Sequence, residues 1–135
     1  MTPNDIIKTL NLQPHPEGGW YGETWRGDEQ PRASGTSIYF LLEEHQSSDW
    51  HKVDAVEIWH WYAGSPMELH INDGGDTRIE MLGPDVMSDQ RPQRIVPTDA
   101  WQKSIPKGGW VLVGCTVSPG FEFSGFELAE KGWSP

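Results

Sequence analysis

Glycine and proline divide this chain into short apolar runs, and this punctuation restricts its fold more than any other feature. The 15 Gly and 11 Pro residues separate segments rich in aromatic and β-branched side chains. Segments of this kind predict strands joined by tight turns, and therefore an all-β fold. With 135 residues, the chain is long enough for one domain with a core and too short for two ordinary ones. We expect one domain over residues 1–135.

Only Thr2–Leu10 is predicted to be helical. Thr2 suits the N-cap, Pro3 suits the first helical position, and Asn11 follows the end. An apolar stripe at spacings of three and four runs along the segment. Because so short a helix is stable only when packed, we expect it to lie on a sheet.

The predicted strands follow one another closely from the Gly18-Gly19 turn to Leu128, and a polar tail occupies 129–135. The clearest buried strand is TSIYFLL at 36–42. The turn at 72–75 lies between two alternating runs, which indicates a hairpin. About ten such short strands are typical of a double-sheet jelly roll or small barrel. They are 20–26, 36–42, parts of 48–64, 67–71, 77–82, 94–96, 100–105, 110–117 and 121–128.

The charge and the cysteine content indicate which binding partners and which cellular compartment to expect. The net charge is -10, and nucleic acids and anionic membranes both bind positive surfaces, so neither is an expected partner. Cys115 is the single cysteine and lies in the apolar run VLVGCTV, which predicts a buried strand residue and no intramolecular disulfide. The start lacks a signal-peptide pattern and no window is apolar enough to span a membrane, so a cytoplasmic protein is expected.

The chemistry concentrates in the segment SDWHKVDAVEIWHWYAG, residues 48–64. Imidazole and carboxylate are acid and base groups. His51 and Glu57 are therefore interpreted as a general acid/base pair in an apolar pocket, or alternatively as a satisfied buried ion pair. Desolvation in such a pocket is expected to raise the pKa of the carboxyl and lower that of the imidazole.

Strand alternation orients the tryptophans of this segment. If Glu57 points inward, Trp59 and Trp61 do so too, and His60 points outward. Trp59, Trp61 and Trp101 are candidates to stack on a sugar or aromatic ligand, and the alternative for each is a place in the core. Gln102 is a further candidate to bind the ligand.

Two other polar residues, Tyr39 and Arg26, have two interpretations each. Tyr39 is a candidate pocket acid or a strand tyrosine at the rim. Arg26 is a candidate to hold a phosphate or carboxylate with its bidentate fork, or forms a surface ion pair. His15 and His45 are expected to be solvated, and His70 to face away from the core.

The spacing of these residues resembles the first sequence motif of the cupin superfamily. That motif has a His, any residue, a second His, three or four residues, a Glu, six residues and a Gly. His51, Val53, Glu57 and Gly64 fall on this spacing, with valine in place of the second His.

The second cupin motif and four longer segments extend the resemblance. Its pattern of Pro, any residue, Gly, two residues and His falls on 97–102, with Asp99 for Gly and Gln102 for His. HPEGGWYGETWR, TSIYFLL, HKVDAVEIWHWYAG and VLVGCTVSPGFEFSGFELA are similar to the cupin-5 branch, a family of unknown function. The resemblance spans Leu12–Ala129 and implies a cupin double-stranded β-helix, or jelly-roll barrel, over about 18–128. It also implies a pocket at one open end and a homodimer.

A more distant likeness concerns dTDP-sugar epimerases, through the segment GGWYGETW. Those enzymes use a His base and a Tyr acid and no metal. The likeness implies metal-independent proton transfer, with His51 or Glu57 as the base and Tyr39 as the acid.

A metal-dependent cupin would supply three His and one Glu. His51, Glu57 and Gln102 stand at three of these places, and Val53 cannot ligate. Divalent metals prefer at least three good donors, so no cofactor is expected to be required, and a divalent metal on these three residues is the alternative.

Three functions therefore stay open for a small-molecule-binding protein. The first is a metal-independent isomerase or epimerase that acts on a sugar-like or polar metabolite. The second is a non-catalytic ligand-binding or sensor protein, and the third is a divalent-metal-dependent enzyme.

Overall fold

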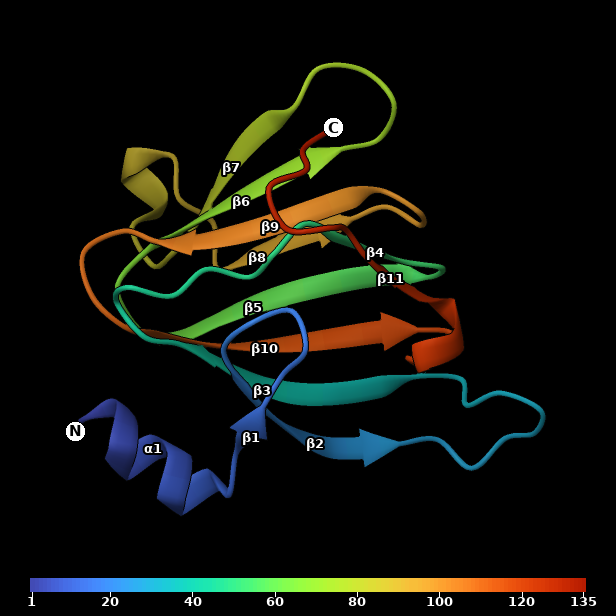
Figure 1. Cartoon of the computed structure of the whole chain (residues 1–135). Helices are drawn as coiled ribbons and strands as arrows, with labels where there is room; N and C mark the ends of the chain where they lie inside the picture. The colour runs from blue at the N-terminus through green and yellow to red at the C-terminus, as the bar shows by residue number, and fades with distance from the viewer.

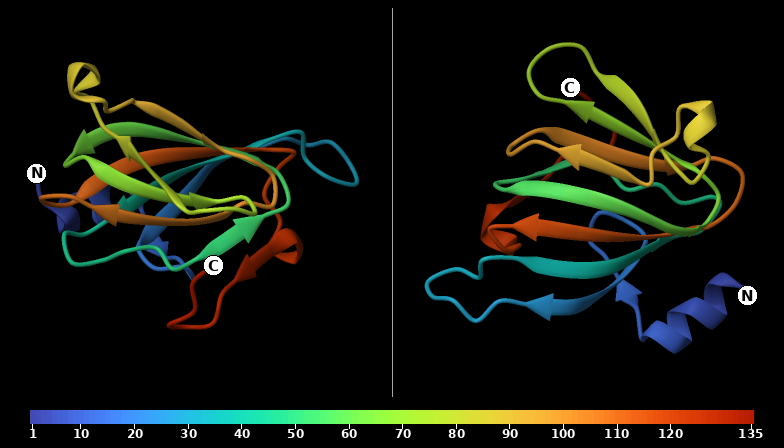
Figure 2. Two further views of the ribbon diagram at one scale, coloured as in Figure 1. Left: turned by 90° about the horizontal axis from the view of Figure 1, so that it is seen from above. Right: turned by 180° about the vertical axis from the view of Figure 1, so that it is seen from behind.

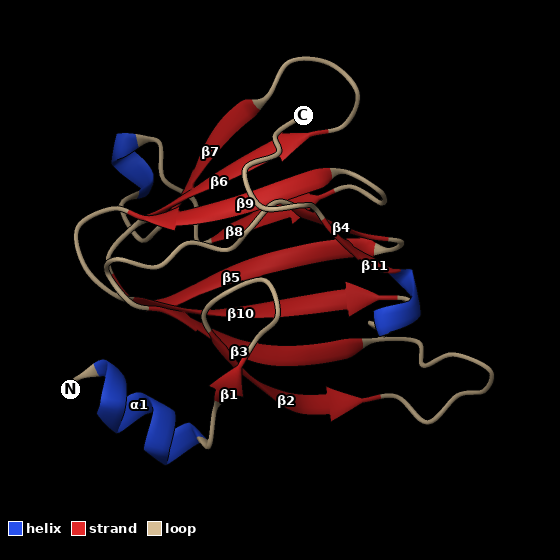
Figure 3. Cartoon of the chain, viewed as in Figure 1, coloured by secondary structure: helices blue, strands red, loops and turns tan.

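A computed structural model describes all 135 residues, as two antiparallel sheets with one short α-helix (Figure 1). This confirms the predicted all-β cupin architecture. The six-stranded sheet has the order β1-β2-β3-β10-β5-β8, and the five-stranded sheet the order β11-β4-β9-β6-β7. In Figure 3 strands make up nearly all of the regular structure. No helix is long and apolar enough to cross a membrane.

The elements follow the chain in this order: α1 (Pro3–Leu10), β1 (Gln13–Pro14), β2 (Trp20–Arg26), β3 (Thr36–Leu42), β4 (His51–Val53), β5 (Val56–Gly64), β6 (Met67–Asn72), β7 (Arg78–Leu82), η1 (Val86–Ser88), β8 (Gln93–Val96), β9 (Trp101–Pro106), β10 (Val111–Ser118), η2 (Phe123–Gly125) and β11 (Phe126–Leu128).

The α1 helix forms as its sequence predicts. The Thr2 hydroxyl accepts the Asp5 N–H at 3.2 Å, and the Asp5 carboxylate accepts the Thr2 N–H at 3.0 Å, so both ends of a capping box are present. Asn11 ends the helix in the left-handed conformation, with φ 54°. Ile6 is buried against Leu41 of β3, so the helix covers part of the outer face of the six-stranded sheet.

The main core lies between the two sheets, whose strands Figure 2 shows from above and from behind. Its members alternate along their strands, as period-two patterning requires. Trp59 of β5 is the largest fully buried side chain and packs edge-on against Phe40 at 5.8 Å between ring centroids. The buried set comprises Phe40, Leu42, Trp59, Met67, Leu69, Ile71, Leu82, Val96, Ala100, Val111, Val113 and Cys115.

The predicted alternation of β5 is confirmed. Glu57 and Trp59 are buried between the sheets, and Trp61 packs against the same core. His60 lies on the other face, where its Nε2 is 3.1 Å from the Thr116 hydroxyl. The pairing with β10 shifts register after Trp61, so the bulge falls beyond the residues that matter for the site.

One prediction about the C-terminal part is wrong. Residues 121–128 do not form one strand, because Phe123–Gly125 turns as a short 3₁₀-helix and only Phe126–Leu128 pairs with β4. The chain bends here because Phe121 N–H donates to the Thr36 hydroxyl at 2.9 Å, which fixes the segment across the end of the six-stranded sheet. In the exposed tail, Trp133 packs on Trp101 at 4.7 Å between ring centroids.

Candidate functional site

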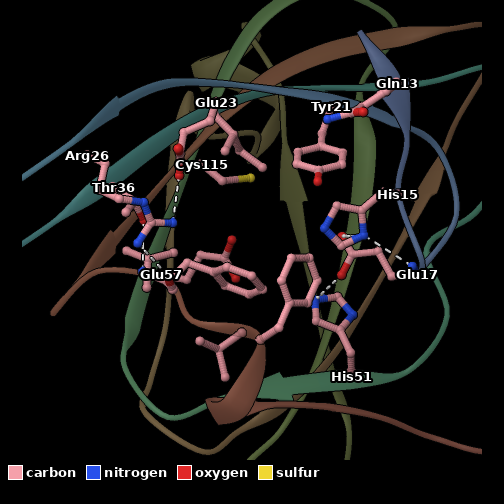
Figure 4. A pocket seen from close by; sticks show the side chains of 15 residues that line it. Gln13, His15, Glu17, Tyr21, Glu23, Arg26, Thr36, His51, Glu57 and Cys115 are labelled. Carbon is pink, nitrogen blue, oxygen red and sulfur yellow. Dashed lines mark hydrogen bonds and ion pairs between the residues drawn. The ribbon is translucent and has the colours of Figure 1, made fainter. Parts of the chain in front are cut away.

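A cavity of about 240 Å³ opens between the N-terminal strands and the C-terminal segment (Figure 4). This is just below the usual range for small-molecule pockets, so it suits a compact ligand. Its mouth is formed by half-exposed side chains of β2 and by Phe123. It is lined by Gln13, His15, Glu17, Tyr21, Glu23, Arg26, Thr36, Ile38, His51, Val53, Glu57, Cys115, Val117, Phe121 and Phe123.

His51 starts β4 and forms a buried ion pair with Glu17. Its Nε2 lies 2.8 Å from Glu17 Oε2, and its Nδ1 lies 2.8 Å from the carbonyl oxygen of Asp49. A carbonyl can only accept, so Nδ1 donates, and the carboxylate favours a proton on Nε2 as well. Burial opposes the charged ring, but Glu17 outweighs it and raises the pKa of His51 to about 9. The predicted lowering is therefore wrong, and His51 is an imidazolium at neutral pH.

A glycine turn positions Glu17. Gly18 and Gly19 have φ values of 103° and 78°, which side chains with a Cβ rarely adopt. The Glu17 carbonyl accepts the Asp49 N–H at 2.6 Å, and this joins the turn to the segment just before His51. Burial alone would raise the pKa of the Glu17 carboxyl, but the His51 cation reverses this and holds it below its ordinary value.

Glu57 sits at the cavity wall, at the end of a hydrogen-bonded chain. The Trp59 indole can only donate, and it does so to Gln102 Oε1 at 2.9 Å. This fixes the orientation of the amide, whose Nε2 then donates to Glu57 Oε1 at 2.9 Å. All three side chains are at least nine-tenths buried. The two strands that carry Trp59 and Gln102 therefore hold the Glu57 carboxyl in a fixed place.

Burial makes the Glu57 carboxyl a weaker acid than an exposed glutamate. Desolvation is the main cause and the Glu17 carboxylate adds to it, while the His51 cation and the Gln102 amide oppose them. The pKa of Glu57 rises to about 7, as predicted in direction. The Cys115 thiol lies beside Glu57, and burial raises its pKa well above the ordinary value, so it stays protonated. A carboxyl in this state both accepts and gives a proton near neutral pH.

His15 and Tyr21 line the opposite part of the cavity. His15 was expected to be solvated, and this is wrong, because its side chain is 5% exposed. Burial lowers the pKa of His15, and its Nδ1 accepts the Glu17 backbone N–H at 3.1 Å. The Tyr21 ring packs edge-on against it at 4.6 Å between centroids.

Arg26 lines the cavity at its mouth. A residue that holds a phosphate or carboxylate of a ligand would need this position. Its guanidinium donates to Glu23 Oε1 at 2.7 Å and to the carbonyl oxygen of Phe121 at 2.9 Å. Both Arg26 and Glu23 are about two-fifths exposed, so the ion pair is the surface kind and contributes little to stability.

Five predicted ligand-facing residues lie outside the cavity, and one of them, Gln102, is buried behind Glu57. Tyr39 points to the outer face of the six-stranded sheet, where it packs with the α1 cluster and with Tyr62, because β3 turns Ile38 and Phe40 inward instead. The expectation of Tyr39 as a pocket acid is thereby corrected. Trp59 is closed into the core. Trp61 packs against the core and donates to the Ser65 carbonyl, and Trp101 contacts Trp133 and Lys52 outside the barrel.

The residues at the motif positions do not fit a divalent metal. The structure has no group of three or more His, Cys, Asp or Glu that could hold an ion. Both nitrogens of His51 are engaged as donors, and Gln102 turns its NH₂ group, which is no ligand, toward Glu57. Val53 closes the fourth position with an apolar, buried side chain.

Three important site residues, His15, Glu17 and Tyr21, escaped prediction. All belong to the HPEGGWY part of the segment that resembles the cupin-5 branch. The signal that could have identified them is the pair of glycines, which predicts a tight turn that brings the flanking polar side chains together.

The fold and this cavity define the chain as a cupin, a double-stranded β-helix with its site at one end of the barrel. More specifically, residues 4–129 match the family Cupin_5, described as cupin superfamily (DUF985), and the chain belongs to that family. The family is a domain of unknown function. No protein of curated function matches the chain.

Solved structures agree with this assignment. A Shewanella oneidensis protein is 36% identical, with a TM-score of 0.91, over 96% of this chain and 85% of that one. A hypothetical protein from Leishmania major is 32% identical, with a TM-score of 0.87, over 96% and 88% of the two chains. Oxalate decarboxylase from Bacillus subtilis is 13% identical, with a TM-score of 0.69, over 90% of this chain and 30% of that one. The last likeness shows the fold alone.

Proposed function

We propose that this cupin binds a small polar or sugar-like molecule in its cavity and exchanges a proton with it at Glu57, as isomerases and epimerases do. One observation carries the proposal: Glu57 is a fixed, buried carboxyl at the cavity wall whose pKa is about 7. General acid/base catalysis is most efficient when the pKa of the group lies near the working pH.

His51 supports the site without acting as the base. Its two ring nitrogens are engaged by Glu17 and by the Asp49 carbonyl, so it has no free lone pair to accept a substrate proton. Its positive charge keeps the Glu57 pKa from rising further. Of the two bases considered from the sequence, the geometry therefore favours Glu57.

The reaction proposed is proton abstraction from carbon next to a carbonyl. Glu57 takes the proton, the C–H electron pair moves toward the carbonyl oxygen, and the same proton or one from solvent returns to carbon. No oxidant or reductant takes part, and this step requires no metal. A binding-only protein would use the same cavity but leave the C–H bonds intact.

Deuterium incorporation separates these two functions. The protein is incubated in D₂O with dihydroxyacetone, erythrulose and the common aldoses, and exchange at the carbon next to the carbonyl is followed by NMR. We expect exchange above the buffer rate with the wild type and none with Glu57→Gln. Ligand binding without any exchange would favour the non-catalytic binding function. The exposed carboxylate Glu44 offers a matched control, because Glu44→Gln should exchange as the wild type does.

A further inference from the structure

The tautomer of His15 is fixed by the turn that carries it. Its Nδ1 accepts the backbone N–H of Glu17 at 3.1 Å, so this nitrogen carries no proton. Burial lowers the pKa of His15, which keeps the ring neutral at physiological pH. The one ring proton therefore sits on Nε2. The only hydrogen bond of the ring is the one at Nδ1, and in Figure 4 the Nε2 side of the ring faces the cavity that His15 lines.

Tyr21 adds a second free donor at the same place. Its phenol oxygen takes part in none of the side-chain hydrogen bonds of the structure. Because no fully buried polar side-chain atom lacks a partner, this oxygen is open to the cavity, into which it points beside His15 in Figure 4. The two residues lie on opposite sides of the β1–β2 turn, and their rings are 4.6 Å apart. The Tyr21 ring packs against the main core, which holds the phenol in place. Two neutral groups that can each donate a hydrogen bond thus lie side by side at the cavity wall.

The other charged groups of the wall are mainly carboxyl groups. Carboxyl groups of Glu17, Glu23 and Glu57 line the same cavity, and the cations His51 and Arg26 are already engaged with carboxylates. A ligand that satisfies this wall has one acceptor oxygen for the two donors and several hydroxyl groups for the carboxylates.

We propose that the Nε2–H of His15 and the hydroxyl of Tyr21 form a two-donor site for the carbonyl oxygen of a small hydroxylated ketone or aldehyde. The proposal deepens the proposed function, because it names the ligand class of the same cavity and rests on that cavity binding a polar molecule. It concerns recognition alone, and it holds whether or not Glu57 transfers a proton.

Dihydroxyacetone and glycerol test it, because they have the same carbon chain and differ only at the carbonyl. Binding of each to the full chain is measured by NMR titration. We expect dihydroxyacetone to bind about tenfold more tightly than glycerol, the effect of roughly one well-made hydrogen bond. Equal binding of the two compounds, or no binding of dihydroxyacetone, would overturn the proposal.

Two variants assign the preference to the donors. Tyr21→Phe removes the hydroxyl and keeps the ring, and His15→Asn removes the Nε2–H while its amide oxygen can still accept the Glu17 N–H. Each should reduce the preference for dihydroxyacetone severalfold, and Tyr39→Phe, on the outer face, should retain it. A preference that survives in Tyr21→Phe refutes the site even if His15→Asn fails to fold.

The two proposals fail separately. Glu57→Gln should lose deuterium exchange and keep the preference for dihydroxyacetone over glycerol. If the wild type keeps the preference but exchanges no deuterium, the donor site stands and the proton transfer fails. If exchange occurs and the preference is absent, the donor site fails.

Discussion

Replacement of Glu57 by Gln should change how the stability of the protein depends on pH. In the folded chain the pKa of this carboxyl is about 7, against an ordinary value of 4.5. Between these values the folded state holds a proton that the unfolded chain has released. Stability that depends on proton uptake falls as the pH rises, so Glu57 should make the wild type progressively less stable between about pH 4.5 and 7.

The size of the effect follows from the width of the window. One proton bound only by the folded state changes the free energy of unfolding by about 1.4 kcal/mol per pH unit. From about pH 5 to about pH 6.5, the wild type should therefore lose roughly 2 kcal/mol relative to Glu57→Gln. Within this window His51 is charged in the folded state, because its pKa is about 9. Glu17 is ionised there too, because its pKa lies below its ordinary value.

Urea denaturation of both proteins at a series of pH values measures this difference. His15 and His60 also have lowered pKa values, and each makes stability rise with pH below about 6.5, but both are present in wild type and variant and cancel in the difference. Glu44→Gln, in an exposed loop, should give a curve parallel to that of the wild type. If Glu57→Gln also runs parallel to the wild type from pH 5 to 6.5, the raised pKa and the function built on it are refuted.

Three further predictions concern the surroundings of this group. Glu17→Gln should lower the pKa of His51 from about 9, because it removes the main partner of the cation, and a histidine NMR titration would contradict this if the pKa did not move. Trp59→Phe should reduce the free energy of unfolding by about 2 kcal/mol, since it leaves the buried Gln102 oxygen without its donor; urea denaturation equal to that of the wild type would argue against the hydrogen-bonded chain. The homodimer implied by the cupin resemblance should appear as a mass of twice 15.3 kDa in sedimentation equilibrium, and a monomer would overturn it.

The elements governed by local patterning were predictable from the sequence. The Thr2 cap and the strands 20–26 and 36–42 have the predicted boundaries, because capping and period-two alternation act over a few residues. The FEFSGFEL segment was mispredicted for the opposite reason. Its alternation suits a strand, but contacts with Thr36 and Asp54, distant in sequence, bend it.

The candidate site also has a part that the sequence predicts and a part that it does not. Motif spacing indicated that Glu57 and Gln102 belong together, and the structure places them 2.9 Å apart on different strands. His15 and Glu17 lie in a turn whose position depends on where it docks, and the hydrogen bond from Asp49 that docks it is invisible in the sequence. Without Glu17, burial alone predicts a neutral His51, which is why the sequence-based pKa direction was wrong.

Glu17 also engages the His51 nitrogen that a metal ion would need. A metal-binding imidazole must offer a lone pair, whereas this ring donates from Nδ1 to Asp49 and faces a carboxylate with Nε2. The imidazolium then supplies a positive charge beside Glu57, where a metal cupin would place its ion. A singly charged ring opposes the burial of Glu57 only in part, so the carboxyl keeps a pKa of about 7. A divalent ion in the place of this ring would hold the Glu57 carboxyl ionised. The buried ion pair therefore leaves Glu57, at a position that matches a cupin metal ligand, with a pKa suited to the proton exchange proposed above.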